Sequence, residues 1–300
     1  MPHPIPYQGS KRHLARRILS ITPKCGGRLI EPFAGSAAIT LAAATRSAFQ
    51  QYIIGDALRP LVEIWKLIIS DPERLAAGYE RLWRNQLDDP RRAYDRARAE
   101  FNATGNPVLL LYLLARCVKG SVRFNTQGEF NQAPDNRRLG MRPSVMRGEL
   151  RGAHSLLTGR AQVRAADFGD TLADAGPGDV VYLDPPYQGI SAGRDRRYVR
   201  GVGVDDLVQE LDQLNARGIP FLLSYDGERS GHTYGTELPS ALDLLKVALP
   251  AGRSAQATLI GRAEITVESL YVSPAARSAL LRFGAVVRTS EQESLYAGRA

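Results

Sequence analysis

The sequence predicts an α/β fold: a mostly parallel β-sheet with helices on both faces, interrupted by a mainly helical insertion. Three observations support this fold class. Helical patterns at 36–44 and 205–217 alternate with strand-like segments, which is typical of parallel sheets. Between about 60 and 150 the alternation stops, and amphipathic helical segments follow one another. Five short apolar segments end in or near an acidic residue, at 28–33, 52–56, 161–167, 180–184 and 220–226.

These five segments have the composition of buried strands, because they are short, rich in Ile, Leu, Val, Phe and Tyr, and bounded by small or acidic residues. The acids at their ends matter for function. In open parallel sheets, ligands bind beyond the carboxyl ends of the strands. The acids that fall at this predicted edge include Glu31, Asp56, Asp167 and Asp184.

The insertion contains four helical patterns, LVEIWKLII, ERLAAGYERLW, YDRARAEF and PVLLLYLLARCV, followed by a stretch rich in Asn, Gly and Arg without strong periodicity. Within that stretch, RFNTQGEFNQ has a TQG turn between β-compatible flanks and predicts a hairpin. We therefore expect a discontinuous core domain of residues 1–60 and 155–280 and an inserted domain of residues 61–154. For the tail, residues 281–300, the sequence is compatible with disorder.

Composition narrows the function classes. The chain has 44% hydrophobic residues and a net charge of +8, with no apolar run of about 18 residues and no apolar signal core, so we expect a cytoplasmic protein without a membrane partner. Cys25 and Cys117 lack the spacing of metal ligands, so we expect no metal. Six arginines against three acids in 121–151, and four against one in 193–203, favour a nucleic acid partner.

The segment EPFAGSAA combines a strand end, a tight glycine turn and a helix start. Gly35 permits close backbone approach, and a helix N-terminus offers free N–H groups to an anion. Asp56 ends the next strand about 20 residues later, a spacing at which an acid can accept hydrogen bonds from ribose hydroxyls. Together these features suggest a cofactor that contains adenosine. The sequence has neither GxGxxG nor a P-loop motif, which argues against NAD and ATP.

The segment VVYLDPPY delivers a carboxylate at the end of a buried strand. Pro185 and Pro186 end the strand and stiffen the turn, and neither has a backbone N–H. Asp184 and the carbonyl of Pro185 can therefore accept both hydrogens of one exocyclic NH2 group. Tyr187 offers a ring on which a base can stack.

The chain resembles the Dam-type family of DNA adenine-N6 methyltransferases over most of residues 5–273. The motifs that carry this resemblance are PYQGSKRHL, EPFAGSAAIT, RFNTQGEFNQAP, DPPY and FLLSYD. The chain departs from the family pattern at Ser10 and Ala37, where glycine is common, and at Tyr225, where Asn is frequent. The resemblance implies the Rossmann-like fold of methyltransferases that use S-adenosylmethionine (SAM).

The resemblance also implies roles for individual residues. The EPFAG loop would hold the methionine end of SAM, Asp56 the ribose, and Asp167 with Phe168 the adenine ring, while Tyr7 and Lys11 would close the site. The expected cofactor-binding residues are Tyr7, Lys11, Glu31, Phe33, Gly35, Asp56, Asp167, Phe168 and Asp184. The expected catalytic residues are Asp184, Pro185, Pro186 and Tyr187. Because the target amine must reach this pocket, the adenine would flip out of the duplex.

The inserted domain would recognise double-stranded DNA. We expect contacts from Arg123, Asn125, Asn131, Arg137, Arg138 and Arg142, and from Arg194 and Arg197 in the loop GRDRRYVRG after DPPY. Asn125 and Asn131 could instead cap turns. If the enzyme belongs to a restriction–modification system, a cognate restriction endonuclease is a further partner.

Other functions stay open from the sequence alone. Cytosine-N4 methyltransferases and RNA amino methyltransferases share related motifs, although the former often carry Ser in place of Asp184 and the latter usually lack the RFNxxGxFN insert. A catalytically silent DNA-binding regulator could keep the same fold. The missing glycine fingerprint disfavours a dinucleotide oxidoreductase.

Overall fold

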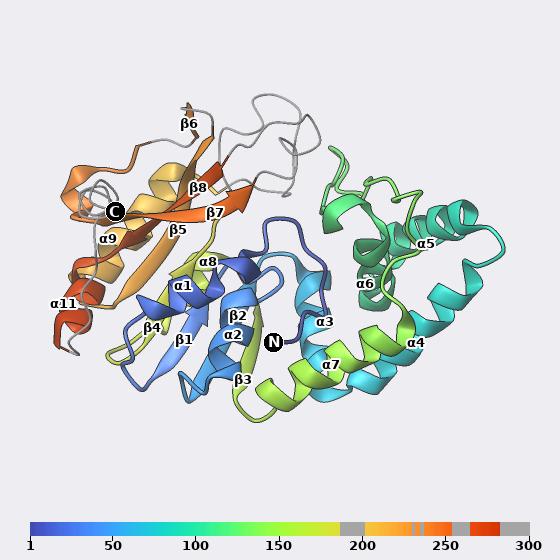
Figure 1. The fold of residues 1–300 in the computed structure, drawn as a ribbon, viewed down its shortest axis with the longest axis horizontal. Helices are drawn as coiled ribbons and strands as arrows, with labels where there is room; N and C mark the ends of the chain where they lie inside the picture. The colour runs from blue at the N-terminus through green and yellow to red at the C-terminus, as the bar shows by residue number, and fades with distance from the viewer. Residues whose placement is uncertain (187–201, 230–231, 235–236, 254–264, 283–300) are drawn as a thin grey trace, which may run out of the picture.

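The structure is a computed structural model that describes residues 1–186, 202–229, 232–234, 237–253 and 265–282. Its centre is a mostly parallel sheet with the strand order β3-β2-β1-β4-β5-β8-β7 (Figure 1). The strands are β1 (Arg28–Glu31), β2 (Gln51–Asp56), β3 (Ala161–Ala165), β4 (Val180–Leu183), β5 (Phe221–Arg229), β6 (His232–Tyr234), β7 (Leu245–Arg253) and β8 (Ile265–Val272). The predicted α/β fold class is confirmed, and each of the five predicted strands is present.

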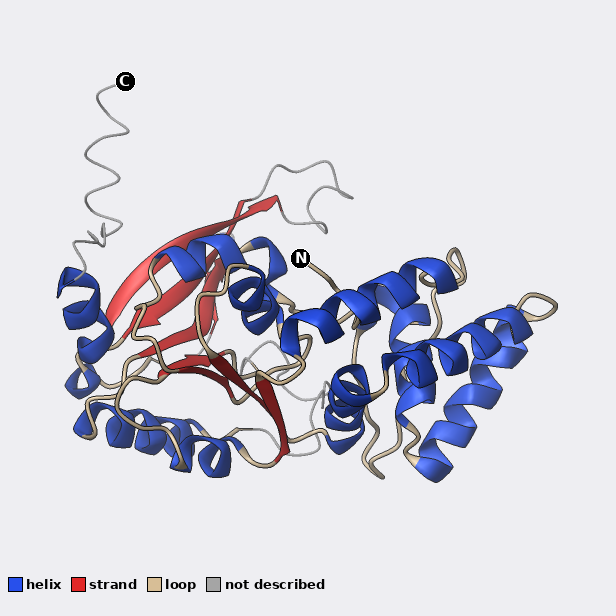
Figure 2. Ribbon diagram, turned by 90° about the horizontal axis from the view of Figure 1, so that it is seen from below, coloured by secondary structure: helices blue, strands red, loops and turns tan. Residues whose placement is uncertain are grey.

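Side chains of the central strands alternate between two separate apolar cores, as the period of two in a strand requires. In β4, for example, Val180 and Tyr182 pack into one core, whereas Val181 and Leu183 pack into the other. Helices α1 (Ala15–Ser20) and α2 (Ala38–Thr45) contribute to the first core. Helices α8 (Phe168–Ala173) and α9 (Val204–Ala216) contribute to the second core. Figure 2 shows helices on both sides of the sheet. Continuous burial on both faces explains why these strands read as unbroken apolar runs.

Five helices follow one another between β2 and β3: α3 (Arg59–Ser70), α4 (Pro72–Asn85), α5 (Pro90–Thr104), α6 (Pro107–Arg116) and α7 (Pro143–Leu157). Helices α3 to α6 coincide with the four helical patterns of the sequence. A proline stands at the first position of α4, α5 and α6 and at the second position of α3, which fits the helix start, where a missing N–H costs nothing. The sequence reading missed α7, because the Asn/Gly/Arg-rich stretch before it obscures where the helical period resumes. Figure 1 shows α4, α5 and α6 beyond the β3 edge of the sheet.

Among the strands named in the order above, β8 runs opposite to the others. Strand β8 is antiparallel to both β5 and β7. The beginning of β8 therefore lies at the edge where the parallel strands end, and Glu268 pairs in register with Gly227 of β5. Helix α11 (Pro274–Arg282) follows β8 and includes the first two residues of the tail that was predicted over 281–300. The rest of that tail, residues 283–300, lies outside the described part of the chain.

Short 3-10 turns complete the described elements. η1 (Lys11–His13) precedes α1, η2 (Val118–Gly120) follows α6, and η3 (Ser240–Leu242) precedes β7. The first of these turns matters for the site, because η1 places Lys11 inside the protein, with only 4% of the residue exposed.

Candidate active site

Gly35 lies where four parts of the chain meet. Its φ of +50° belongs to the left-handed region that glycine adopts without strain. Its N–H donates to Asp56 Oδ2 at 3.0 Å, and its carbonyl accepts from Trp65 Nε1 at 3.0 Å. A Cβ atom at this position would lie 3.0 Å from Cε1 of Tyr7. The turn after β1, the end of β2, helix α3 and the N-terminal segment are thus packed around one glycine.

Asp56 is buried at the end of β2, and both carboxylate oxygens accept backbone hydrogen bonds. Oδ1 accepts from Leu58 N at 2.9 Å, while Oδ2 accepts from Gly35 N. Burial raises the pKa of Asp56 to about 6, and the two backbone hydrogen bonds oppose that rise. Each carboxylate oxygen has a second lone pair, so Asp56 retains acceptor capacity for a ligand hydroxyl.

Glu31, at the end of β1, has a local partner. Its Oε2 accepts from the backbone N and the hydroxyl of Thr40 at 3.0 and 2.6 Å. Helix α2 begins after Ala37, which has no side-chain acceptor and a φ of +45°. The Glu31 side chain therefore caps α2 in place of the N-cap residue, because it accepts a hydrogen bond from a free N–H group of the first turn. Burial raises its pKa to about 8.

Phe33 and Phe168 form a stacked pair with ring centroids 5.1 Å apart. The pair joins the turn after β1 to the first residue of α8. Asp167 precedes Phe168 as the N-cap of that helix, where its side chain accepts from Gly169 N at 3.2 Å, and it is exposed. The structure therefore brings Phe33 and Phe168 together as a flat apolar surface, bordered by the carboxylate of Asp167.

Asp184 follows β4, and its carboxylate forms a buried ion pair with the N-terminal segment. Lys11 Nζ lies 2.8 Å from Asp184 Oδ1, across 173 residues of chain. Burial raises the pKa of Asp184, and the ammonium of Lys11 opposes this rise. Lys11 thus favours the ionised form of Asp184, which is the form that accepts hydrogen bonds.

The remainder of the DPPY motif is only partly described. Pro185 is buried, Pro186 is partly exposed, and Tyr187 lies outside the described residues. Behind the motif, the hydroxyl of Tyr182 shares a 2.9 Å hydrogen bond with Ser224 of β5. This bond links the two strands whose ends carry DPPY and FLLSYD. Both of these neighbours are buried, so they support the motif from inside the sheet.

The predicted hairpin of the insertion is present around Gly128. Asn131 N donates to Arg123 O at 3.0 Å, and Asn125 N donates to Glu129 O at 2.8 Å. Asn125 is used within this turn, since its Oδ1 accepts from two backbone N–H groups and its Nδ2 donates to Glu129 Oε2. Asn125 therefore acts here as a turn cap, the alternative that the sequence left open beside base contact.

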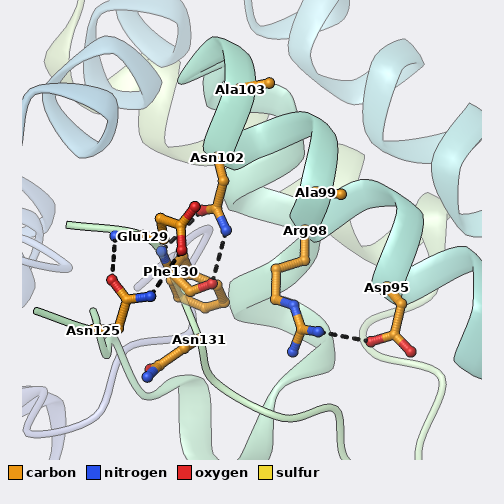
Figure 3. A pocket seen from close by; sticks show the side chains of 9 residues that line it. All are labelled: Asp95, Arg98, Ala99, Asn102, Ala103, Asn125, Glu129, Phe130 and Asn131. Atoms are coloured by element: carbon orange, nitrogen blue, oxygen red, sulfur yellow. Dashed lines mark hydrogen bonds and ion pairs between the residues drawn. The ribbon is translucent and has the colours of Figure 1, made fainter. Parts of the chain in front are cut away.

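Asn102 of α5 fixes the hairpin to the helices. Its Nδ2 donates to Phe130 O at 3.1 Å, and its Oδ1 accepts from Phe130 N at 2.8 Å, so it pairs with both backbone groups of one residue. Figure 3 shows this pair at the wall of a pocket of about 520 Å³ between α5 and the hairpin. The wall also contains the Arg98–Asp95 ion pair and the side chain of Asn131.

The chain after the hairpin is irregular, but buried side chains of the helices hold its backbone carbonyls. Tyr94 donates to Gln132 O, Arg116 to Asp135 O and Arg138 O, Gln86 to Leu139 O, and Tyr79 to Met141 O. Buried donors and acceptors need partners. Carbonyls of this irregular segment therefore find partners in the helical scaffold, which fixes its course without regular secondary structure.

The exposed side chains of the hairpin and of the irregular segment after it include five of the predicted DNA contacts, namely Arg123, Asn131, Arg137, Arg138 and Arg142. Arg138 has an ion-pair contact with Asp135 at 4.0 Å. Arg194 and Arg197 lie outside the described residues. The structure thus presents a basic surface on an anchored loop.

Comparison with known proteins identifies the family. Residues 7–247 match the model of the D12 class N6 adenine-specific DNA methyltransferases. The chain belongs to this family. Its members include proteins that modify adenine at N6 in DNA, so the class of reaction is adenine-specific DNA methylation. The cytosine-N4, RNA and oxidoreductase alternatives are not supported by this match.

Individual relatives agree with the family. The chain is 30% identical over 227 residues to the retron Ec67 DNA adenine methylase of Escherichia coli, which covers 73% of this chain and 75% of that protein. It is 30% identical over 190 residues to the DNA adenine methylase of Serratia marcescens, covering 62% of this chain and 67% of that protein. The match to the DNA N-6-adenine-methyltransferase of Escherichia phage P1 covers only 23% of that longer protein, at 27% identity.

Two further findings concern the described residues of this D12-class chain. None of their helices has the length and apolar composition needed to cross a membrane. The same residues contain no group of three or more His, Cys, Asp or Glu side chains arranged to hold a metal ion.

Three residues that contact the site or the hairpin were not recognised from the sequence. Trp65 was visible only as an apolar residue of a helix, and Glu268 stood in a segment to which no strand was assigned. Asn102 gave no signal at all, because its partner Phe130 is 28 residues away. Each contact depends on elements that tertiary packing brings together.

Proposed function

We propose that this chain transfers a methyl group from SAM to the N6 amine of an adenine that has left double-stranded DNA. The observation that carries this proposal is the position of Asp184. Its carboxylate stands at the end of β4, held by Lys11, at the same sheet edge as the Gly35–Asp56 hydrogen bond. A cofactor site and an acceptor for an amine are therefore neighbours, as methyl transfer requires.

The residues present fit SAM. The turn at Gly35 has no side chain, and a Cβ atom there would lie 3.0 Å from the ring of Tyr7, so glycine lets the N-terminal segment pack closely on the turn that would hold SAM. Asp56 has acceptor capacity for ribose hydroxyls, and the Phe33–Phe168 pair offers an apolar face for an adenine ring beside Asp167. Glu31 supports this site indirectly, because its carboxyl group holds the start of α2.

The chemical problem is that the amine of adenine shares its lone pair with the ring and is a weak nucleophile. Asp184 and the carbonyl of Pro185 accept the two N–H hydrogens, which favours a pyramidal nitrogen and stabilises the positive charge that develops on it. Bound SAM would supply an electrophilic methyl group, with the electron pair of the methyl–sulfur bond remaining on sulfur as the bond to N6 forms. The amine would then lose one proton, which the Asp184 carboxylate can accept.

The two proline rings and Tyr187 complete the motif. Pro185 and Pro186 stiffen the turn and remove competing N–H donors. In this proposal Tyr187 stacks on the flipped base, so its aromatic face contributes more than its hydroxyl.

We further propose that catalysis and DNA recognition belong to two different domains of the chain. Residues 1–60 and 155–280 form the catalytic domain, and residues 61–154 form the target-recognition domain. The anchored segment that begins with the hairpin supports this division, since a loop with a fixed course can present side chains to base edges at low entropic cost. Arg123, Asn131 and Arg137 are donors suited to bases and phosphates, and Arg138, Arg142, Arg194 and Arg197 would add backbone contacts.

A cytoplasmic location agrees with an enzyme that acts on DNA. If the chain is one half of a restriction–modification pair, an endonuclease with the same recognition sequence is its partner. Protection of methylated DNA from that endonuclease is the direct measurement.

The test of the proposed function is single-turnover transfer of labelled methyl from SAM to duplex DNA, with the product nucleoside identified by mass spectrometry. We expect N6-methyladenine at a defined sequence. The appearance of N4-methylcytosine, or transfer to RNA alone, would overturn the proposal. Methylation-sensitive sequencing of DNA from cells that express the chain then gives the recognition sequence.

A further inference from the structure

Glu268 stands at the candidate active site although it is 84 positions beyond Asp184 and outside every motif of the sequence. Strand β8 runs antiparallel to β5, so its first residues lie at the edge where β4 and β5 end. Glu268 pairs with Gly227 just past an irregularity in β5 that begins at Ser224. The antiparallel strand thus adds a second carboxylate to an edge where the parallel strands already supply Asp184.

The ammonium of Lys11 lies close to the carboxylates of both Asp184 and Glu268. Lys11 Nζ lies 2.8 Å from Asp184 Oδ1 and 3.5 Å from Glu268 Oε2. The contact with Asp184 is a hydrogen bond, whereas the contact with Glu268 is not, and within the described part of the chain this Glu268 oxygen is buried and accepts no hydrogen bond. A buried acceptor without a hydrogen bond is costly, so the site favours any state in which Lys11 moves the short distance towards Glu268.

Such a state would assist the chemistry proposed for Asp184. The carboxylate must accept a hydrogen bond from the target amine, and in this structure one of its oxygens is taken by a buried ammonium. An ammonium is a stronger donor than a neutral aromatic amine and competes for the same lone pairs. The further Lys11 moves towards Glu268, the better this oxygen can accept from the amine, and the ammonium keeps a carboxylate beside it, which favours a buried charge.

We propose that Glu268 is a positioning residue that takes up the Lys11 ammonium when the target amine engages Asp184. This inference rests on the proposed function of Asp184. In the structure described here Lys11 is bonded to Asp184, and in the complex with DNA it is bonded to Glu268. The exchange replaces one hydrogen bond by another and transfers no proton, since Lys11 remains protonated and both carboxylates remain ionised.

The charges around Asp184 make its pKa sensitive to the charge of Glu268. The pH–rate profile therefore distinguishes the proposed role of Glu268 from a purely structural one. Lys11 of η1 lowers the pKa of Asp184, while burial and the charge of Glu268 on β8 raise it. Glu31 of β1 and Tyr182 of β4 also face this carboxylate. Removing the charge of Glu268 should therefore lower the pKa of Asp184 and move the acidic limb of the pH–rate profile to lower pH.

The experiment compares Glu268→Gln with the full-length wild type in single-turnover methyl transfer at saturating SAM. The variant keeps the side-chain shape and should lose about tenfold in rate, the effect of one lost charge-assisted hydrogen bond, with the acidic limb displaced to lower pH. Glu268→Asp should retain the position of the limb and regain part of the rate. Glu63→Gln is the matched control, because it removes the charge from the exposed ion pair with Lys66 and should change neither quantity.

Wild-type rate and pH profile in Glu268→Gln would overturn this inference. It would equally be overturned by a loss of rate that follows a lower melting temperature and leaves the acidic limb in place. The proposed function is judged separately by Asp184→Ala. If that variant is inactive while Glu268→Gln is normal, the function stands and the role of Glu268 is wrong, whereas near-normal Asp184→Ala removes the mechanism itself.

Discussion

The N–H of Gly35 donates to Asp56 Oδ2 at 3.0 Å, and this single hydrogen bond ties the turn after β1 to the end of β2. The two residues are 21 positions apart. Their contact joins the two halves of the proposed cofactor site. An assembled site avoids the entropic cost of ordering its loops on binding.

The first prediction concerns this pair. Asp56→Ala should weaken SAM binding by roughly 1–3 kcal/mol, because it removes acceptors for the ribose and leaves the N–H of Gly35 without its partner. Titration calorimetry measures the loss directly. Asp212→Ala, which changes an exposed acid of α9, is the control and should bind SAM as the wild type does. Unchanged affinity in Asp56→Ala would remove Asp56 from the site.

The second prediction concerns methyl transfer. Asp184→Asn keeps the shape but turns a donor towards the substrate amine, and Asp184→Ala removes both acceptors. Each should lower the single-turnover rate by at least ~10²-fold, as the loss of a preorganised transition-state contact does. SAM affinity of Asp184→Asn should change much less than its rate. A loss confined to SAM binding would instead make Asp184 a cofactor ligand only.

The third prediction is a pH dependence. Burial raises the pKa of Asp184 above its ordinary value of 3.8, and only the ionised form accepts hydrogen bonds at both oxygens. The rate should therefore fall as the pH falls through this raised pKa. Lys11→Gln removes the charge that holds the pKa down, so its acidic limb should move to higher pH, in addition to any loss of rate. Lys66→Gln on the surface of α3 should leave the limb in place.

The fourth prediction concerns the recognition loop. Asn102→Ala removes both hydrogen bonds to Phe130 and should loosen the hairpin that carries Arg123 and Asn131. We expect reduced discrimination between cognate and non-cognate duplexes, measured as the ratio of single-turnover rates, with SAM affinity unchanged. Glu100→Ala on the exposed face of the same helix is the control. Equal loss on every duplex would indicate that the hairpin contributes affinity rather than specificity.

The sequence could predict features that depend on neighbouring residues. Strand β4 was recognisable because four successive apolar residues are buried on both faces of a parallel sheet, and DPPY because the turn chemistry is local. The four helices α3 to α6 were recognisable from their apolar period, although α5 begins four residues before the pattern that revealed it. Helix α7 was missed because the irregular segment before it owes its course to distant side chains.

Side-chain roles were harder to predict than elements. The amide of Asn125 could serve a base or a turn, and the structure uses it in the turn. Glu31 stood in the cofactor motif, but its carboxyl group holds the start of α2, because Ala37 offers no cap there. In both cases the residue type allowed two partners, and geometry selected one.

By itself, the sequence determined five strands of the sheet, the order of the motifs along the chain and the residue types at the ends of those strands, since these follow from short-range periodicity and turn chemistry. Tertiary structure alone decided which charges meet. Lys11 reaches Asp184 across 173 residues, and Glu268 joins them only because β8 runs antiparallel to its neighbours. Such contacts depend on the order and direction of the strands, which burial of the whole sheet stabilises. They therefore cannot be predicted from a local sequence pattern.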